Sequence, residues 1–448
     1  MTRRRDLLAL AGGLAGAGLA GCVDSLSPGG TEEIPTLVPE STPDGTPVAT
    51  ATASELGRLV AGNTAFALDL HRRLADASEG NAMASPYSVS TALAMTYAGA
   101  RGRTAEEMAR TLRFDLSRER LHPVVAALDG RVDPDTPSER APTATPHERN
   151  DVPFTVETVN ALWGQAGYPF ADGFLHTLAT HYGTGLRTLD FEAEPDRSRR
   201  RINRWVAGRT DDRITDLLPE GSVTPLTRFV LTNAVYFLSN WASTFEREAT
   251  EQREFTALDG TTSRVATMFQ RHGYPFAAVD GYRVVELPYE NREFGMVIVL
   301  PPEGQFRETE RSLDAGRLTR LFDALSEREG ALYLPRFTVE TGLDLSAALS
   351  TLGMPSAFSP DTADFSGVVE PSGRPDLFLQ GVHHRTVLEV AEWGTEAAAA
   401  TGAVGGGGGA PDDPFEMHVD RPFLFCIRHR PTGVVLFLGR VVDAAAAQ

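Results

Sequence analysis

The sequence predicts an α+β protein with large β-sheets. Apolar residues recur at helical spacing in the first part of the chain, between residues 55 and 77 and again after Ser85. From about residue 155 onward, runs of β-branched and aromatic residues bounded by turn residues predict strands. Helices that come first and mixed strands that dominate later favour the α+β class. With 42% hydrophobic residues, the chain of 448 residues has enough apolar material for a substantial core.

The first 22 residues are typical of an export signal. Arg3 to Arg5 form a twin-arginine-like start, and residues 7–20 are apolar but too short and Gly-rich to span a membrane. The stretch ends in LAGC, which resembles a bacterial-type lipobox, in which the cysteine, here Cys22, is lipidated. The alternative is an uncleaved anchor or a plain signal peptide with a chance cysteine. We therefore expect a lipid-anchored protein at the extracellular face of the cell membrane, tethered by more than one acyl chain.

Two segments rich in Pro, Thr and Ser have no periodic pattern. Residues 23–54 are expected to be a flexible stalk, and residues 133–153 an exposed insertion within the folded part. The folded domain is expected to span residues 55–443, with a tail at 444–448.

Two early helices follow from spacing and capping. The expected buried stripe of the first helix consists of Leu59, Phe66, Leu70 and Leu74. The second helix begins with Ser85 as its N-cap and Pro86 at its first position. Its expected buried face consists of Val89, Ala92, Leu93 and Tyr97.

Five later runs predict strands. They are residues 155–164, 227–238, 295–304, 331–340 and 422–442. The last run contains two strands joined by a turn at 431–433. It also holds Cys426, which is expected in the core. Because Cys22 belongs to the export signal, no disulfide within the domain is expected.

The net charge of the chain disfavours some classes of binding partner. The net charge is −18, and all 42 basic residues are arginine because the sequence contains no lysine. An excess of carboxylates keeps a surface hydrated and disfavours nucleic acid as a partner. This composition resembles that of halophilic microbes, where salt screens the self-repulsion. A genomic bias toward arginine codons is the plainer explanation, and the two are compatible.

Signatures of common enzymes are missing. A P-loop needs lysine, and the GxSxG and HExxH motifs are absent. Ser85 and His384 could be imagined in a hydrolase triad, but a serine at a helix start is far more often a cap. His383 and His384 could bind a metal, but adjacent strand residues face opposite sides, so one buried and one surface histidine are expected. We therefore expect no enzyme, no metal and no cofactor.

Six blocks of sequence resemble the serpin family in its order. The first contains SPYS and GARGRT, which match the family's SPxS and GAxGxT elements. The blocks are residues 81–108, 202–219, 229–245, 334–368, 382–401 and 421–441. The resemblance runs from about Asn63 to Val442. It implies a monomer with a single domain, three β-sheets, about nine helices and an exposed reactive-centre loop, with hinge and loop at 392–415.

The resemblance also implies a mechanism. Serpins are suicide substrates of serine, and sometimes cysteine, proteases: the protease cuts the loop, is trapped as an acyl-enzyme, and the cut loop enters the main sheet. The matching hinge residues are Glu392, Gly394, Thr395, Glu396, Ala397, Ala398, Ala399, Ala400 and Thr401. In an inserted strand, alternate residues from Thr395 to Thr401 share the face toward the core. Trp393 is bulkier than is usual at its position.

Further residues match the family's sheet-opening region. Ser85, Ser88, Asn233 and His384 match the polar cluster beneath the sheet, and Trp241 matches the tryptophan at its top. Asn160 lies in a similar buried strand context. Ordinary packing and hydrogen bonding would also explain these residues.

The cleavage site is less well defined. Counting 17 residues from Glu392 places the scissile bond between Gly408 and Gly409, where no side chain is offered to a protease. An elastase- or subtilisin-like enzyme would prefer Val404, and cutting there favours substrate behaviour over trapping. The segment from Gly409 to Arg421 is also a few residues longer than usual. We therefore expect an inhibitor of extracellular serine proteases, with a non-inhibitory serpin acting as a binding or structural module as the alternative.

Overall fold

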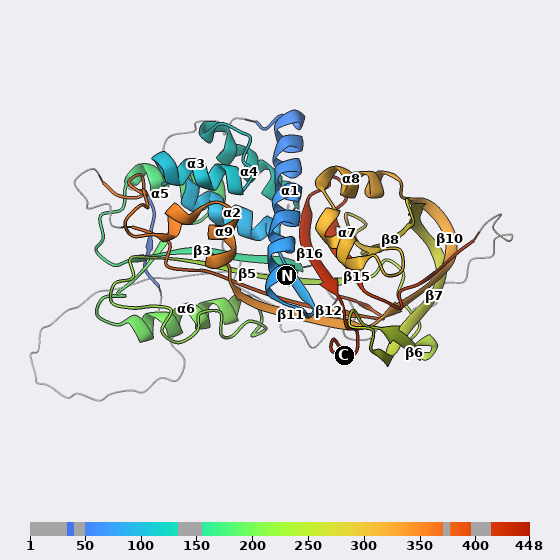
Figure 1. Ribbon diagram of the computed structural model, residues 1–448. Coiled ribbons are helices and arrows are strands. Elements are labelled where there is room, and N and C mark those ends of the chain that lie inside the picture. Colours follow the sequence, from blue (N-terminus) through green and yellow to red (C-terminus); the bar gives the residue numbers. More distant parts are fainter. Residues whose placement is uncertain (1–33, 40–49, 133–154, 371–376, 396–413) are drawn as a thin grey trace, which may run out of the picture. The chain divides into compact units, whose positions relative to one another are not determined.

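The computed structural model describes residues 34–39, 50–132, 155–370, 377–395 and 414–448 (Figure 1). The chain divides after Ile34, and the account below concerns the unit Pro35–Gln448. The export signal with Cys22 and the insertion at 133–153 lie outside the described residues.

The described residues form nine α-helices, the number that the resemblance implies. They are α1 (Ala53–Ala77), α2 (Pro86–Tyr97), α3 (Gly102–Thr111), α4 (Arg118–Val132), α5 (Asp172–Tyr182), α6 (Pro195–Arg209), α7 (Phe306–Ser312), α8 (Ala315–Asp323) and α9 (Ser346–Leu352). Two 3₁₀ helices accompany them, η1 (Arg247–Ala249) and η2 (Pro355–Phe358). The predicted stripes of α1 and α2 are buried, and Ser85 caps α2 by accepting a hydrogen bond from the Ser88 amide.

A seven-stranded sheet, here called sheet A, has the order β1-β4-β3-β5-β13-β12-β11. Its strands are β1 (Thr36–Leu37), β3 (Thr155–Gln165), β4 (Leu186–Leu189), β5 (Phe229–Asn240), β11 (Phe337–Asp344), β12 (Val382–Ala391) and β13 (Gly394–Thr395). Figure 1 shows α2, α3, α4 and α9 over one face of sheet A and α6 over the other.

The remaining strands form a nine-stranded sheet, here called sheet B. They are β2 (Ala82–Ala84), β6 (Glu251–Thr256), β7 (Thr262–Val279), β8 (Tyr282–Pro288), β9 (Phe294–Leu300), β10 (Ser326–Pro335), β14 (Phe415–His418), β15 (Phe423–His429) and β16 (Val435–Val441). β7 has 18 residues and pairs with β6, β10 and β8. This long strand joins the two smaller sheets that the resemblance implies into one ladder.

Three boundaries differ from the sequence predictions. The run at 331–340 is two strands in different sheets, because the chain leaves β10 in sheet B at Pro335 and enters β11 in sheet A at Phe337. Part of the predicted stalk is β1, whose edge pairing with β4 satisfies its backbone groups. The predicted tail is packed: Ala444 is buried, and the Ala447 carbonyl accepts a hydrogen bond from Thr338.

Candidate functional site

The middle of sheet A holds two parallel strands with a short third strand wedged between their ends. β5 and β12 are parallel neighbours, with Val382 opposite Leu231 at the start of their pairing. Toward the C-terminal ends, β13 lies between them and is antiparallel to both. Thr395 is opposite Ser239 on β5 and Val390 on β12. Two predicted hinge residues therefore already form a strand of sheet A.

Gly394 is required where β13 begins. Its backbone has a φ of +156°, and a Cβ at this position would lie only 2.2 Å from the Ser239 carbonyl oxygen. No larger residue fits without moving β5, so glycine allows the close approach of the two backbones.

Glu392, in the turn before β13, is almost completely buried, with 2% of its surface exposed. Its carboxylate accepts hydrogen bonds from the Arg336 guanidinium, at 2.8 Å from Nε, and from the Thr250 hydroxyl, at 2.5 Å. Its backbone carbonyl accepts from the Phe245 amide. Burial by itself would raise the pKa of Glu392, but the hydrogen bonds from Arg336 and Thr250 outweigh it and hold the pKa below its ordinary value.

Trp241, which directly follows β5, is hydrogen-bonded to the last residue of β12 and to the turn before β13. Its indole Nε1 donates to the Ala391 carbonyl at 2.9 Å, and its backbone amide donates to the Trp393 carbonyl at 2.9 Å. Its ring stacks on Tyr289 with a centroid separation of 4.7 Å. The Tyr289 hydroxyl in turn lies 2.8 Å from the Thr395 hydroxyl, and both groups are buried. The hinge is thus hydrogen-bonded to the residue where insertion is expected to begin.

Four of the predicted sheet-opening residues meet beneath the parallel pair. The Ser85 amide donates to His384 Nε2 at 3.1 Å, and His384 Nδ1 contacts the Asn233 side-chain oxygen. The Asn233 amide donates to the Ser88 hydroxyl at 2.5 Å. Asn160, on β3, completes the network, since its Oδ1 accepts from Ser88 at 3.2 Å. One network therefore links β3, β5 and β12 to the start of α2.

The protonation of His384 follows from its partners. A backbone amide only donates, so Nε2 is the acceptor and we assign the proton to Nδ1, which donates to Asn233. Burial lowers the pKa of His384 to about 4, although the bond to Asn233 acts in the opposite direction. His384 is therefore neutral at physiological pH, while the adjacent His383 is only half-buried.

The hydrolase alternative lacks the hydrogen bond that it requires. The Ser85 hydroxyl donates to the Leu436 carbonyl at 2.7 Å instead of to His384, and both side chains are buried. Among the described residues, no cluster of His, Cys, Asp and Glu could hold a metal ion. None of the described helices combines the length and hydrophobicity needed to cross a membrane.

Several predicted residues lie outside the described part of the chain. They are Glu396, Ala397, Ala398, Ala399, Ala400, Thr401, Val404, Gly408, Gly409 and the lipidation candidate Cys22. Sequence reasoning also missed three partners of the hinge, Arg336, Thr250 and Tyr289. Only Arg336 left a signal, as a charge between Pro335 and Phe337 in the strand-like run at 331–340.

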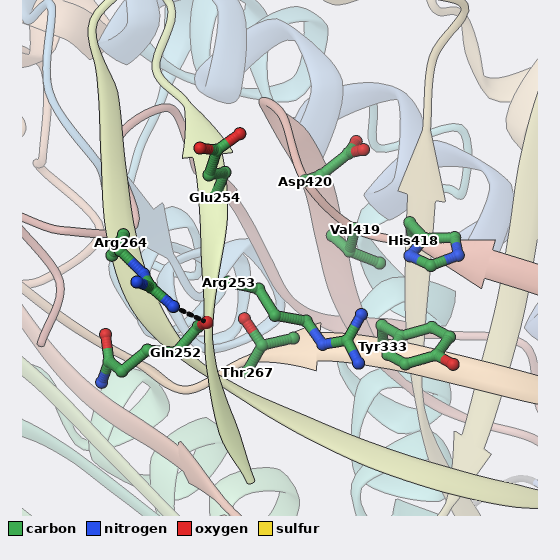
Figure 2. Close-up of a pocket in the computed structure, with 9 residues that line it drawn as sticks. All are labelled: Gln252, Arg253, Glu254, Arg264, Thr267, Tyr333, His418, Val419 and Asp420. Atoms are coloured by element: carbon green, nitrogen blue, oxygen red, sulfur yellow. Dashed lines mark hydrogen bonds between the residues drawn. The ribbon is translucent and has the colours of Figure 1, made fainter.

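Past the C-terminal end of the reactive loop, β14 and the residues after it line an open pocket of about 450 Å³ (Figure 2). The Arg253 guanidinium lies 4.2 Å from the centre of the Tyr333 ring, and the His418 ring stacks parallel to Tyr333 at 4.2 Å. Glu254 and Asp420 add carboxylates to the wall. Through Tyr333, these contacts hold both β14 and β6 against β10.

Comparisons with known proteins agree with this architecture. A family model described as "Serpin (serine protease inhibitor)" matches residues 61–444. The leukocyte elastase inhibitor of Equus caballus is 35% identical over 394 residues, which cover 86% of this chain and 98% of that protein. An uncharacterised serpin-like protein of Thermococcus kodakarensis is 37% identical over 381 residues, with 84% of each chain covered.

Solved structures are similar over the same part of the chain. The crystal structure of maspin matches with a TM-score of 0.75 at 25% identity, covering 87% of this chain and 100% of that one. The native state of tengpin, a thermophilic serpin, matches with a TM-score of 0.74 at 26% identity, covering 86% and 94%.

Proposed function

Because the chain belongs to the serpin family, we propose that it inhibits serine-type endopeptidases as a suicide substrate. A protease, of the subtilisin or elastase kind, cuts the reactive loop and is held as the acyl-enzyme while the loop enters sheet A. The observation that carries this proposal is β13, the hinge strand between β5 and β12.

The direction of β13 makes its extension favourable. A strand that continues it would replace the parallel pairing of β5 and β12 with two antiparallel pairings. Antiparallel ladders are slightly more stable per residue than parallel ones. The cut loop would therefore gain backbone hydrogen bonds on both edges, and sheet A would gain one long strand.

The register of β13 determines which residues of β5 and β12 each inserted residue would pair with. Continued by six residues from Thr395, it brings Thr401 opposite Asn233 on β5 and His384 on β12. Directly opposite residues in a ladder share one face. The Thr401 hydroxyl would thus arrive at the buried polar network beneath the sheet, where it has hydrogen-bonding partners.

The same register separates the two candidate cleavage sites. Gly405 would lie opposite Phe229, the first residue of β5, so Gly408 lies beyond the end of that strand. Val404 would lie opposite Val230, inside the sheet. A protease esterified at Val404 would block the last steps of insertion, whereas one at Gly408 would not. Cleavage at Gly408–Gly409 is therefore the trapping event that we propose.

Inhibition is tested by incubating the protein with subtilisin-like and elastase-like proteases. We expect a covalent complex that survives SDS, and a Gly408 acyl end when the complex is mapped by mass spectrometry. In Ala399→Arg, a charge would enter the core face of the inserted strand, so we expect cleavage without complex. Ala399→Ser places a small side chain at the same position and is expected to trap like the wild type. Only nicked wild-type protein, with no complex, would count against inhibition of these enzymes.

The non-inhibitory alternative is motivated by the glycine-rich loop, which offers a protease little to recognise. A thermal scan of the nicked protein separates the two functions. Insertion adds a strand to sheet A, so an inhibitory serpin melts at a much higher temperature once cut. An unchanged melting temperature after cleavage would favour a binding or structural module.

We also propose that the protein is exported and held at the outer face of the cell membrane through lipid on Cys22. The motivation is the lipobox-like LAGC sequence after a short apolar stretch. In the native host, Cys22→Ser is expected to move the protein from the membrane fraction to the medium. Equal membrane retention of this variant would contradict the lipid anchor.

A further inference from the structure

A cavity of about 530 Å³ lies between α4 and α5, distinct from the pocket in Figure 2. The connection from α2 to α3 and residues 367–369 complete its wall. Its polar lining consists of Arg101, Arg118, Glu119, Thr177, His122 and His181. The mechanism proposed above uses none of these side chains.

The two arginines leave most of their donors unused. Arg118 donates through Nη1 to the carbonyls of Tyr97, Ala98 and Ala100, the last at 2.6 Å. Arg101 also donates through Nη1 alone, to Ala98 and Ala100. Within the described part of the chain, Nε and Nη2 of both guanidiniums have no acceptor. Burial, and next the charge of Arg118, lower the pKa of Arg101, which shows that the two cations repel each other.

The histidines also present nitrogen atoms without partners. His122 is 5% exposed, and its Nδ1 lies 2.7 Å from the Tyr182 hydroxyl, while its Nε2 has no partner among the described residues. Burial raises the pKa of Tyr182, so its hydroxyl is protonated and can donate to Nδ1. In that tautomer, and in the charged imidazolium, Nε2 carries a proton and is an unused donor. His181 stacks on His122 at 6.2 Å and has an unpartnered, buried Nδ1.

We propose that this cavity, here called the α4–α5 site, binds a doubly charged tetrahedral oxyanion, a sulfate or phosphate group, free or as a monoester. Two guanidiniums and two imidazoles supply donors to the group. Buried donors without acceptors are costly, and charge-assisted bonds to an oxyanion are the strong kind. The first turn of α5 also lines the cavity; its N-cap, Ala171, has no side-chain acceptor, and of its amides that of Asp172 donates to the Glu370 carboxylate at 3.2 Å.

The other charged groups around the site leave it receptive to an anion. Glu119 is the only carboxylate in the lining, and it is bonded to its own backbone amide and to Ser117. Asp364 faces Arg101 from outside the lining, and His176 faces His181. Two further carboxylates, Asp172 and Glu370, lie outside the lining at the start of α5, where Glu370 accepts from the Asp172 amide. At neutral pH the histidines are uncharged, because burial lowers the pKa of His122 to about 4 and also lowers that of His181.

Binding is therefore expected to depend on pH. An anion next to an imidazole favours its charged form, so the complex has higher histidine pKa values than the empty protein. Protons are then taken up on binding, and affinity rises as the pH falls. Sulfate is the best probe, because its charge stays constant between pH 5 and 8.

The test is calorimetric titration of the full chain with sodium sulfate, in sodium chloride of matched ionic strength. We expect saturable binding that is at least tenfold tighter at pH 5 than at pH 7.5, with proton uptake. Arg101→Gln and His122→Gln are expected to weaken it at least tenfold. Arg131→Gln removes the same charge from the exposed far end of α4, where the guanidinium bonds only to Ala127, and should bind sulfate like the wild type.

A second measurement, on the wild-type protein, is needed in case a variant fails to fold. In the wild type, sulfate should shift the NMR titration of His122 to higher pH, whereas sodium chloride should not. Inorganic phosphate and glucose 6-phosphate then distinguish a free anion from a monoester: binding of both shows that the site accepts an esterified group. Equal sulfate binding by Arg101→Gln, or the absence of any histidine shift, overturns the proposal.

Discussion

At the scale of single residues, one carboxylate anchors the start of β13, the strand that the proposed insertion would extend. Glu392 is buried, and it is held by Arg336, between β10 and β11, and by Thr250, between η1 and β6, both far away in sequence. Because these partners offset the burial that would raise the pKa of Glu392, we expect the position of β13 to depend on them. The residue that the resemblance identifies as the hinge glutamate is therefore also the residue that fixes the top of sheet A.

Replacing Arg336 tests this anchor. In Arg336→Gln, Glu392 keeps its bond to Thr250 but loses the guanidinium, and we expect the free energy of unfolding to fall by about 1–3 kcal/mol at pH 7. The pKa of Glu392 is lowered in the folded state, so its stabilisation is present above the ordinary carboxylate pKa and is lost as the pH falls through the lowered value. The difference between variant and wild type should therefore shrink in acid. Urea unfolding at several pH values measures both effects.

Arg385→Gln is the matched control for this prediction. It removes an arginine from β12 that pairs with Glu340 at the surface, where 52% of the glutamate side chain is exposed. Exposed pairs contribute about 0–1 kcal/mol. If the two variants lost the same stability, the buried anchor would have no special role.

At the scale of elements, local patterns predicted most helices and strands. They did not predict where one strand ends and the next begins within a continuous strand-like run. The periodic stripe of α1 and the Ser85–Pro86 start of α2 are local signals, and both are confirmed. Pro335 and Arg336 are the only interruption in the strand-like run at 331–340, which is too little for a local pattern to reveal that β10 and β11 belong to different sheets. That division depends on pairing with β7 and β12, which are distant in sequence.

The candidate site was predictable to a similar extent. The resemblance identified Asn233, His384 and Trp241, and each lies in or beside the network that joins β5 to β12. It did not provide Arg336 or Tyr289, because their roles come from a three-dimensional contact with the hinge and from no local motif. The pre-formed strand β13 was likewise unexpected, since two residues are too few for a strand pattern.

At the scale of the whole molecule, the chain has the serpin fold with an unusually acidic composition. The net charge is −18, and arginine provides every basic side chain. Self-repulsion among carboxylates destabilises the compact state, and salt reduces it, since the screening length falls from about 10 Å at 0.1 M to about 3 Å at 1 M.

We therefore expect sodium chloride to stabilise the uncut protein. Raising the concentration from 0.1 to 2 M should increase the melting temperature by several degrees at pH 7. At pH 5, near the isoelectric point of about 5.0, the net charge is close to zero, so the same salt step should have a smaller effect. Calorimetry at both pH values measures this, and a salt effect that is equal at the two would contradict the electrostatic explanation.

β13 has one more consequence, which concerns the kinetics of insertion. Ordinarily the first rung of a new strand carries the entropy cost of closing a flexible loop, a cost that grows by only about 0.6 kcal/mol for each doubling of length. Here the pairing of Thr395 with β5 and β12 already provides that nucleus before any bond is cut. In the proposed mechanism, β13 would then be extended one residue at a time from this paired end. With the proposed cut at Gly408–Gly409, the residues after Gly409 would stay with the other fragment, so the length of that segment should not alter the rate of the proposed insertion.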